Sequence, residues 1–309
     1  MANNISSEIL GAMLEELSPE KDTKALCNAR LACHAFQDII DPQLYRAVTI
    51  SNNYDLDNWD TSTKLLHTFK NNPPLGRHVK RLSVVYSPDM DMDLLAAVLR
   101  VMVGLTSYHG GMAKFDGATS LQFSQIDSYN LLRSLTCPKL EIFIWDIPVA
   151  FEGFMSAPFI ISPTRLAVDE EFLRKLRQWP SLKQLAVPNM HTNTIIPATL
   201  APALTVLDCY IPDARHWLPT HPGISRLVLQ DEPYGAQWIA VAPMLKNLRW
   251  LHLTFSKKTE CEKILGCIAG HLPSLESLNI RLFFEELRHF RSVFLLASAD
   301  LFPAFAGSG

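Results

Sequence analysis

The sequence lacks an excess of charge of either sign. Its 309 residues hold 28 Lys and Arg against 31 Asp and Glu, which gives a formal net charge of −3. Sequence-independent binding to nucleic acid needs a broad positive field. The balance of charge therefore disfavours nucleic acid as a partner.

The chain also lacks a hydrophobic run long enough to cross a membrane. Its longest stretch without a charged residue or histidine, Thr192 to Leu207, is interrupted by Pro197 and Pro202. A spanning helix needs about 20 apolar residues. The first twenty residues carry four glutamates and neither the basic nor the apolar region of a secretory signal. We therefore expect an intracellular protein, cytoplasmic or nuclear, without a membrane partner.

Paired metal ligands are absent as well. No two of the six cysteines have CxxC spacing, so we expect reduced thiols in an intracellular protein. His216 and His221 lie five residues apart near Cys209, which is not the spacing of a metal-binding helix or knuckle. The sequence therefore predicts no metal site.

Catalytic motifs are missing too. His109-Gly110-Gly111 is similar to the oxyanion loop of esterases, but no G-x-S-x-G motif accompanies it. Asp89, Asp91 and Asp93 alternate as at the start of a calcium loop, yet the required Gly and Glu do not follow. We interpret these aspartates as the start of a helix at Leu94, since acidic groups stabilise a helix N-terminus. We predict no catalytic residue and no cofactor, and hence no enzyme.

The first forty-five residues have a helical pattern. Ser6 and Ser7 can cap a helix over residues 8–17, and Ser18-Pro19-Glu20 has the residue types that begin a second one. Asp41-Pro42 is expected to end the helical run. Val48 to Ile50 then has the pattern of an extended segment.

This region resembles the F-box of fungal, basidiomycete-type F-box proteins. The segment RLxCxxFxDIIDPxLYR, from Arg30 to Arg46, carries the more specific half of the likeness. The opening departs from the family pattern, with Ser6 where Pro is usual and Ile5 where Leu is usual. The resemblance implies a three-helix docking module.

The resemblance also implies a partner. An F-box docks a Skp-type adaptor and through it joins a cullin–RING ubiquitin ligase. The segment is small for an independent domain and rich in apolar residues, and a surplus apolar surface normally marks an interface. Carried over by position, the expected adaptor-binding residues are Ile5, Ile9, Leu10, Leu14, Leu17, Leu26, Leu31 and Phe36. Internal packing of the module is the alternative role for each of them.

After residue 50 a short motif, L-x-x-L-x-L, recurs along the chain. Its middle apolar residues are Leu82, Phe143, Leu185, Leu207, Leu227, Leu251 and Leu278. The last five are 22, 20, 24 and 27 residues apart, which are intervals typical of leucine-rich repeats. The motif predicts a row of strands with alternate side chains turned inward.

Helical patterns separate several of these strands. They lie before Leu82, after Tyr86, and before Leu185, Leu251 and Leu278. We expect one further strand at residues 165–168 and turns or single 3₁₀ turns in the proline-rich connections between Leu185 and Leu227. Residues 101–125 fit the pattern poorly, so we place no repeat there, and the number of repeats between residues 85 and 180 stays open. The alternation predicts an irregular leucine-rich-repeat-like α/β solenoid.

The predicted domains are an F-box over residues 3–50, the solenoid over 51–282 and a helix or tail over 283–309, which we interpret as a truncated cap. Among the tryptophans, most occupy core-like positions, and one or two could be exposed as partner anchors. We expect an α/β protein that acts as a substrate-recognition adaptor of an SCF-type (Skp–cullin–F-box) ubiquitin ligase and holds an unknown protein target. A repeat scaffold without ligase docking is one alternative, and an enzyme with a clustered polar site is the other.

Overall fold

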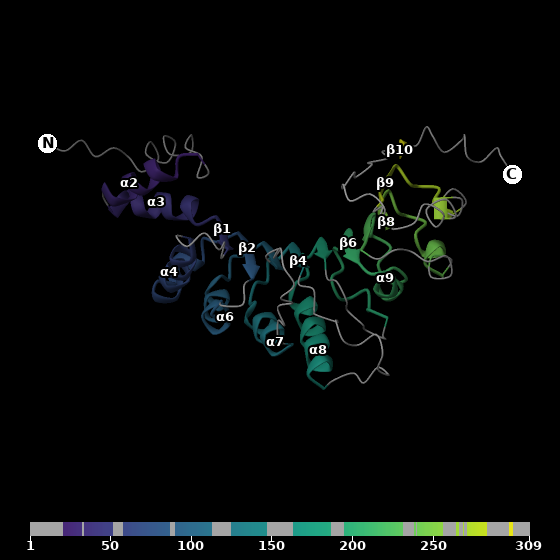
Figure 1. Cartoon of the computed structure of the whole chain (residues 1–309), viewed down its shortest axis with the longest axis horizontal. Coiled ribbons are helices and arrows are strands. Elements are labelled where there is room, and N and C mark those ends of the chain that lie inside the picture. The colour runs from purple at the N-terminus through teal and green to yellow at the C-terminus, as the bar shows by residue number, and fades with distance from the viewer. Residues whose placement is uncertain are drawn as a thin grey trace. The chain divides into compact units, whose positions relative to one another are not determined.

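The computed structural model is an α/β fold in which strands and helices alternate along the chain (Figure 1). It describes residues 21–32, 34–51, 58–86, 90–112, 125–146, 163–186, 195–230, 238, 240–255, 264–265, 268, 271–282 and 297–298. The chain divides into two compact units, Met1–Leu140 and Glu141–Gly309. Each unit is built from the same kind of repeat.

The first unit begins with two helices and continues with a parallel three-stranded arrangement. The helices are α2 (Thr23–Ala32) and α3 (His34–Leu44), and the strands are β1 (Ala47–Ser51), β2 (Arg81–Tyr86) and β3 (Ser107–Met112). Both β1 and β3 pair in parallel with β2. Between and after the strands lie α4 (Asn58–Asn71), α5 (Pro73–Gly76), α6 (Met92–Val101) and α7 (Gln125–Ser134). Helices α4, α6 and α7 lie on one side of the strands (Figure 1).

The second unit holds a longer parallel sheet. Its strands are β4 (Ile142–Asp146), β5 (Gln184–Ala186), β6 (Val206–Cys209), β7 (Arg226–Leu229), β8 (Trp250–Phe255) and β9 (Ser277–Leu282). Each pairs in parallel with the next, and the short β10 (Ala297–Ser298) pairs antiparallel with β9. The connections include α8 (Pro163–Gln178), α9 (Ile211–Trp217) and the 3₁₀ turn η1 (Ala242–Met244). Repeated parallel strands joined through helices are consistent with the predicted leucine-rich-repeat-like solenoid.

The register confirms the aligned repeat positions. In the second unit Phe143, Leu185, Leu207, Leu227, Leu251 and Leu278 pair in turn across adjacent strands. All six side chains are buried. In the first unit Leu82 is likewise paired with Val48 and Tyr108, which are also buried. On the helix-facing side of each sheet, the central residues of adjacent strands therefore form a continuous row of buried apolar side chains.

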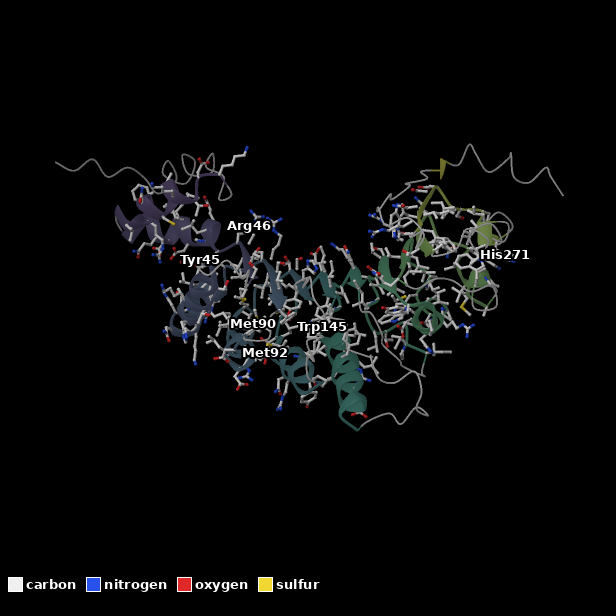
Figure 2. All side chains as sticks on the ribbon, viewed as in Figure 1. Tyr45, Arg46, Met90, Met92, Trp145 and His271 are labelled. Carbon is white, nitrogen blue, oxygen red and sulfur yellow. The ribbon has the colours of Figure 1, made fainter. Side chains whose placement is uncertain are left out.

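The hydrophobic core extends beyond the strands into the turns before them. Three and six residues before each central strand residue, the chain is again buried in most repeats, as at Leu182 and Trp179 or at Leu248 and Leu245. In each of these two turns the later residue's N–H donates to the earlier residue's carbonyl. Trp145, labelled in Figure 2, packs against Phe143 with ring centroids 5.7 Å apart. Each repeat therefore buries apolar residues from the turn before its strand as well as from the strand itself.

Several sequence expectations need correction. Residues 165–168 lie within α8 and form no strand, since the helix begins at Pro163, and proline suits a first helical position because it lacks an N–H. The helix expected to stop at Asp41-Pro42 continues to Leu44, because Pro42 in the last turn removes only one intrahelical hydrogen bond. Strand β3 lies in the region where no repeat was expected.

Two further corrections concern the second unit. The connection after β6 is the seven-residue helix α9 with Pro212 in its first turn, where turns or single 3₁₀ turns were expected. Within the tail expected to be helical, Ala297–Ser298 forms a strand. The other residues of that tail, and the helix expected over residues 8–17, lie outside the described residues. The predicted domain boundaries stay predictions, although β1 already belongs to the parallel strands of the first unit.

Candidate binding face of the repeat sheet

The side of the second unit's sheet that faces away from the helices carries a row of polar and aromatic side chains. Because side chains alternate along a strand, the residues beside each buried central position point to this opposite side. The burial patterns of β6 to β8 alternate in the same way. On the described parts of β6–β9 and the residues that follow β6 and β7, this face consists of Val206, Asp208, Tyr210, Arg226, Val228, Gln230, Trp250, His252, Thr254, Ser277, Asn279 and Arg281. We call this set the front face.

Hydrogen bonds at the start of each strand hold the front face in register. The Thr205 carbonyl accepts from the N–H groups of both Ser225 and Arg226, at 3.0 and 3.1 Å. The Ser225 carbonyl accepts in the same way from Arg249 and Trp250, at 2.9 and 3.0 Å. This repeated pairing fixes where each strand begins, and it therefore fixes which side chains lie next to each other across the face.

An arginine, a tryptophan and a histidine form the centre of the front face. Arg226 on β7 is the register partner of Trp250 on β8, and its guanidinium carbon lies 4.9 Å from the centroid of the tryptophan ring. Further along β8, the His252 ring lies against the Trp250 ring, with centroids 6.0 Å apart and planes inclined by 15°. A cation over an aromatic face is attracted by the ring's quadrupole. The stack holds the Arg226 guanidinium in a fixed position on a partly exposed surface.

Beside this stack lie His252's neighbours on β9. His252 and Asn279 are register partners. Burial lowers the pKa of His252 below its ordinary value, and the positive charge of Arg281 lowers that pKa further. Among the described residues, the Asn279 carbonyl oxygen Oδ1 is buried and has no hydrogen-bond partner. His252 is therefore neutral at pH 7, and this part of the face has hydrogen-bonding capacity that the described residues leave unused.

Acidic charge is scarce on the front face. Among the twelve residues of the set, Asp208 is the single carboxylate, and it accepts a hydrogen bond of 2.6 Å from the Gln230 amide. At the strand-start edge the charges are matched instead, since Arg249 pairs with Glu276 at 3.6 Å and Lys183 with Glu141 at 2.9 Å. The front face thus carries Arg226 and Arg281 against one carboxylate.

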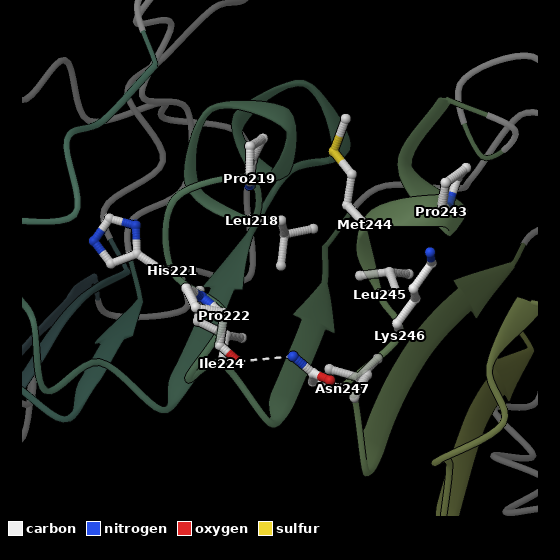
Figure 3. Close-up of a pocket in the computed structure, with 11 residues that line it drawn as sticks. Leu218, Pro219, His221, Pro222, Ile224, Pro243, Met244, Leu245, Lys246 and Asn247 are labelled. Carbon is white, nitrogen blue, oxygen red and sulfur yellow. Dashed lines mark hydrogen bonds between the residues drawn. The ribbon is translucent and has the colours of Figure 1, made fainter.

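A separate pocket lies between two adjacent repeats of the second unit (Figure 3). Its volume is about 260 Å³, and its lining is mostly proline and aliphatic, with Pro219, Pro243 and Met244 among the residues that form it. The Asn247 amide donates to the Pro222 carbonyl across 3.3 Å. The polar side chains of this lining are His221, Lys246 and Asn247.

His221 also lines this pocket and has a structural role. Its ring is buried, with Nε2 2.7 Å from the Leu200 carbonyl oxygen and Nδ1 3.0 Å from the Trp217 carbonyl oxygen. The ring therefore links two adjacent repeats. Within the described part of the chain, no group of three His, Cys, Asp or Glu side chains is placed to hold a metal ion. In the same residues, no helix has the length and apolar character needed to cross a membrane.

The predicted adaptor-binding residues fall in two groups. Leu26 is fully buried with Ile40 in the α2–α3 hairpin, and Phe36 packs partly buried against them. Leu31, on α2, is 77% exposed. The other five, Ile5, Ile9, Leu10, Leu14 and Leu17, lie outside the described residues. Leu26 thus packs inside the hairpin, and Leu31 is the described residue that is open to a partner.

An ion pair ties the hairpin together. The Arg30 guanidinium binds both carboxylate oxygens of Asp41, through Nε and through Nη2. Both residues belong to the segment that resembles the F-box. Together with the Leu26–Ile40 contact, this ion pair fixes α2 against α3.

No family model matches the chain. None of the curated proteins matches it either. Among solved structures, it is similar to a structural-genomics protein from Bacteroides fragilis, with a TM-score of 0.34 and 12% sequence identity. That match covers 89% of this chain and 85% of the other. So distant a likeness leaves the fold assignment resting on the strand pairing and repeat register.

Sequence reasoning missed most of the front face. Trp250 was one of several tryptophans considered as anchors. It is partly exposed, whereas Trp145, Trp179, Trp217 and Trp238 are buried. Arg226, His252 and Asn279 were not singled out. Their signal is positional, because each stands at an x position next to a leucine of the L-x-x-L-x-L motif.

Proposed function

We propose that this chain is a substrate-recognition adaptor of an SCF-type ubiquitin ligase. The N-terminal segment would dock a Skp-type adaptor and, through it, the cullin–RING ligase, and the repeat sheet would hold a protein target. The likeness of residues 30–46 to an F-box supports the first half of the proposal. The front face, with its aromatic and charged centre, supports the second half.

One observation carries the docking half. Leu31 is 77% exposed on a hairpin whose interior is already filled by Leu26 and Ile40. Exposure of a large aliphatic side chain to water is unfavourable. Burial of that side chain against a partner would stabilise the complex by about 1.5–3 kcal/mol. Leu31 is also one of the positions that the resemblance assigns to adaptor contact.

The mechanism is proximity. The ligase's other subunits carry the activated ubiquitin, and this chain raises the effective concentration of the target near it. No covalent step falls to this chain in the proposal. The front face would need to bind its target only long enough for transfer to a target lysine.

The test is copurification of the full chain with a co-expressed Skp-type adaptor. Leu31→Glu places a charge where the proposal needs an apolar contact, and we expect it to reduce recovery of the adaptor at least tenfold. Val103→Glu is the matched control, since Val103 is 44% exposed in the same unit but lies outside the F-box-like segment. Thermal unfolding of both variants shows that the fold is intact.

Two outcomes would overturn the proposal. In one, the unmodified chain fails to bind the adaptor. In the other, Leu31→Glu and Val103→Glu bind it equally well. The chain would then be a repeat-protein scaffold without ligase docking, an alternative that the front face permits because its residues belong to the second unit alone.

A further inference from the structure

Arg226 on the front face is held by an aromatic ring and not by a carboxylate. Four other described cations, Arg30, Arg174, Lys183 and Arg249, each pair with a carboxylate. Arg226 has no such ion pair among the described residues and lies over the Trp250 ring instead. A guanidinium that contacts an aromatic ring in place of a carboxylate has N–H donors left for a partner.

We infer that the front face binds an acidic, extended segment of a target protein, in which Asp or Glu alternates with apolar residues. This inference rests on the proposed function, because it names the chemical class of the target. The carboxylate would be bound by the Arg226 guanidinium over the Trp250 ring. Planar bidentate pairing of guanidinium with carboxylate is the strongest hydrogen-bonded contact available to such a side chain.

Apolar groups on the same face account for the alternation. The Trp250 ring is partly exposed. Val206, the register partner of Arg226, and Val228, the register partner of His252, are also partly exposed. Tryptophan and arginine are the residues most often found at the centre of protein interfaces. A segment with acidic residues alone would leave these apolar surfaces uncovered, whereas alternating side chains of an extended chain can reach both kinds of group.

The charge distribution favours a partner with few carboxylates over a polyanion such as a nucleic acid. His252 is neutral at pH 7 because burial and Arg281 lower its pKa. The charges at the strand-start edge are matched in ion pairs, and the whole chain has a net charge of −3. A nucleic acid would need many more cations along its backbone. A single guanidinium held over an aromatic ring suits one carboxylate.

The test measures fluorescence anisotropy of a labelled twelve-residue peptide in which Glu-Phe pairs are separated by Gly and Ser. Four comparison probes replace Glu by Gln, by Lys or by phosphoserine, or replace the peptide by a single-stranded oligonucleotide of twelve nucleotides. The full chain and three variants are titrated: Arg226→Gln, Trp250→Leu and Arg249→Gln. The last is the matched control, because Arg249 precedes Trp250 but pairs with Glu276 at the edge.

We expect the Glu-Phe peptide to bind about tenfold more tightly than its Gln form, as one charge-assisted contact predicts. Arg226→Gln and Trp250→Leu should each weaken that binding at least fivefold, and Arg249→Gln should not change it. The inference is overturned if the Glu and Gln peptides bind alike, if Arg226→Gln has no effect, or if the phosphoserine peptide or oligonucleotide binds more tightly than the Glu-Phe peptide.

Copurification with the Skp-type adaptor separates this inference from the proposed function. The two front-face variants and the Arg249→Gln control should all retain the adaptor, since their changes lie outside the F-box-like segment. Loss of peptide binding with the adaptor retained would overturn the acidic preference alone. Loss of the adaptor from the unmodified chain would overturn the ligase proposal, and peptide binding would remain measurable.

Discussion

The hydroxyl groups of Tyr86 and Tyr108 hydrogen-bond to each other inside the first unit. The two tyrosines lie on the neighbouring strands β2 and β3, and both side chains are almost completely buried. A buried hydroxyl without a partner loses the hydrogen bonds that it makes to water. Each of these tyrosines supplies the polar partner that the other needs.

The first prediction concerns this pair. Tyr86→Phe or Tyr108→Phe leaves the remaining hydroxyl without that partner, so each should lower the free energy of unfolding by about 1–3 kcal/mol. The double variant Tyr86→Phe/Tyr108→Phe should cost less than the sum of the single changes, because the two hydroxyls share one hydrogen bond that each single change already removes. Urea denaturation of the four proteins gives the coupling energy. Strict additivity would contradict the pairing.

The second prediction concerns alkaline pH. Burial is the main cause that raises the pKa of both hydroxyls well above the ordinary value of about 10. Below pH 10 both are neutral whether the chain is folded or not, so their contribution to stability is complete. Above pH 10 the unfolded chain releases these protons before the folded chain does. Stability therefore falls, by about 1.4 kcal/mol per pH unit for each tyrosine, until the raised folded-state pKa values are passed.

The measurement is the pH dependence of urea denaturation between pH 8 and about pH 11. The double phenylalanine variant is the control, because it lacks both titrating groups. Its stability should fall less steeply above pH 10 than that of the unmodified chain. Equal slopes would show that the two hydroxyls ionise as readily in the folded protein as in the unfolded one.

The third prediction explains a glycine. Gly110 on β3 occupies a position where other repeats bury a leucine, and a Cβ atom there would lie 2.9 Å from the Tyr86 ring and 3.1 Å from the Tyr108 ring. Gly110→Ala should therefore destabilise the protein by about 1–3 kcal/mol through overpacking. Gly223→Ala is the control, since its nearest contact would be an ordinary 3.4 Å. Similar thermal shifts for the two variants would refute this packing.

The fourth prediction concerns the repeat core. Leu251 is fully buried at the central position of β8. Leu251→Ala should reduce the free energy of unfolding by about 2–5 kcal/mol, as cavity-forming changes do. Thr254→Ala, on the other face of the same strand, should change stability by less than about 0.5 kcal/mol. Chemical denaturation of both variants makes the comparison, and equal losses would mean that the two faces are not distinct.

The fifth prediction concerns the start of α6. The Asp91 side chain accepts a hydrogen bond of 2.8 Å from the Leu94 N–H, as the sequence interpretation of the aspartates anticipated in part. Asp91→Ala should cost about 1 kcal/mol, whereas Asp91→Asn should keep most of the stability because asparagine also caps helices well. Thermal unfolding distinguishes them. A loss as large for asparagine as for alanine would assign the effect to charge alone.

The repeat register could be predicted because leucine is both the signal and the structural cause. Burial of Leu185, Leu207 and Leu227 at a common position produces both the spacing in the sequence and the pairing in the sheet. Strand β3 escaped the same pattern because Tyr108 and Gly110 stand where two leucines are usual. Two tyrosines fill the interior there, so the apolar motif disappears while the strand remains.

The front face could not be predicted in detail. Its residues stand at positions that the leucine motif leaves open, and their importance depends on which strands become neighbours. Arg226 and Trp250 are 24 residues apart in the chain and meet only because β7 and β8 pair at that register. A tryptophan in a strand has the same local pattern whether it points to the core or to solvent. Only the phase of the repeat decides between these cases.

The shared carbonyls at the strand starts have an evolutionary consequence. Each shared carbonyl fixes where the next strand begins, whatever the length of the loop or helix between the two strands. The spacing between central residues of consecutive strands ranges from 20 residues, between Leu207 and Leu227, to 42 residues, between Phe143 and Leu185. Insertions and deletions in the connections on the helical side can therefore accumulate without changing the register of the paired strands. Homologues could differ widely in length and sequence while each keeps its own set of side chains at the same outward-facing strand positions.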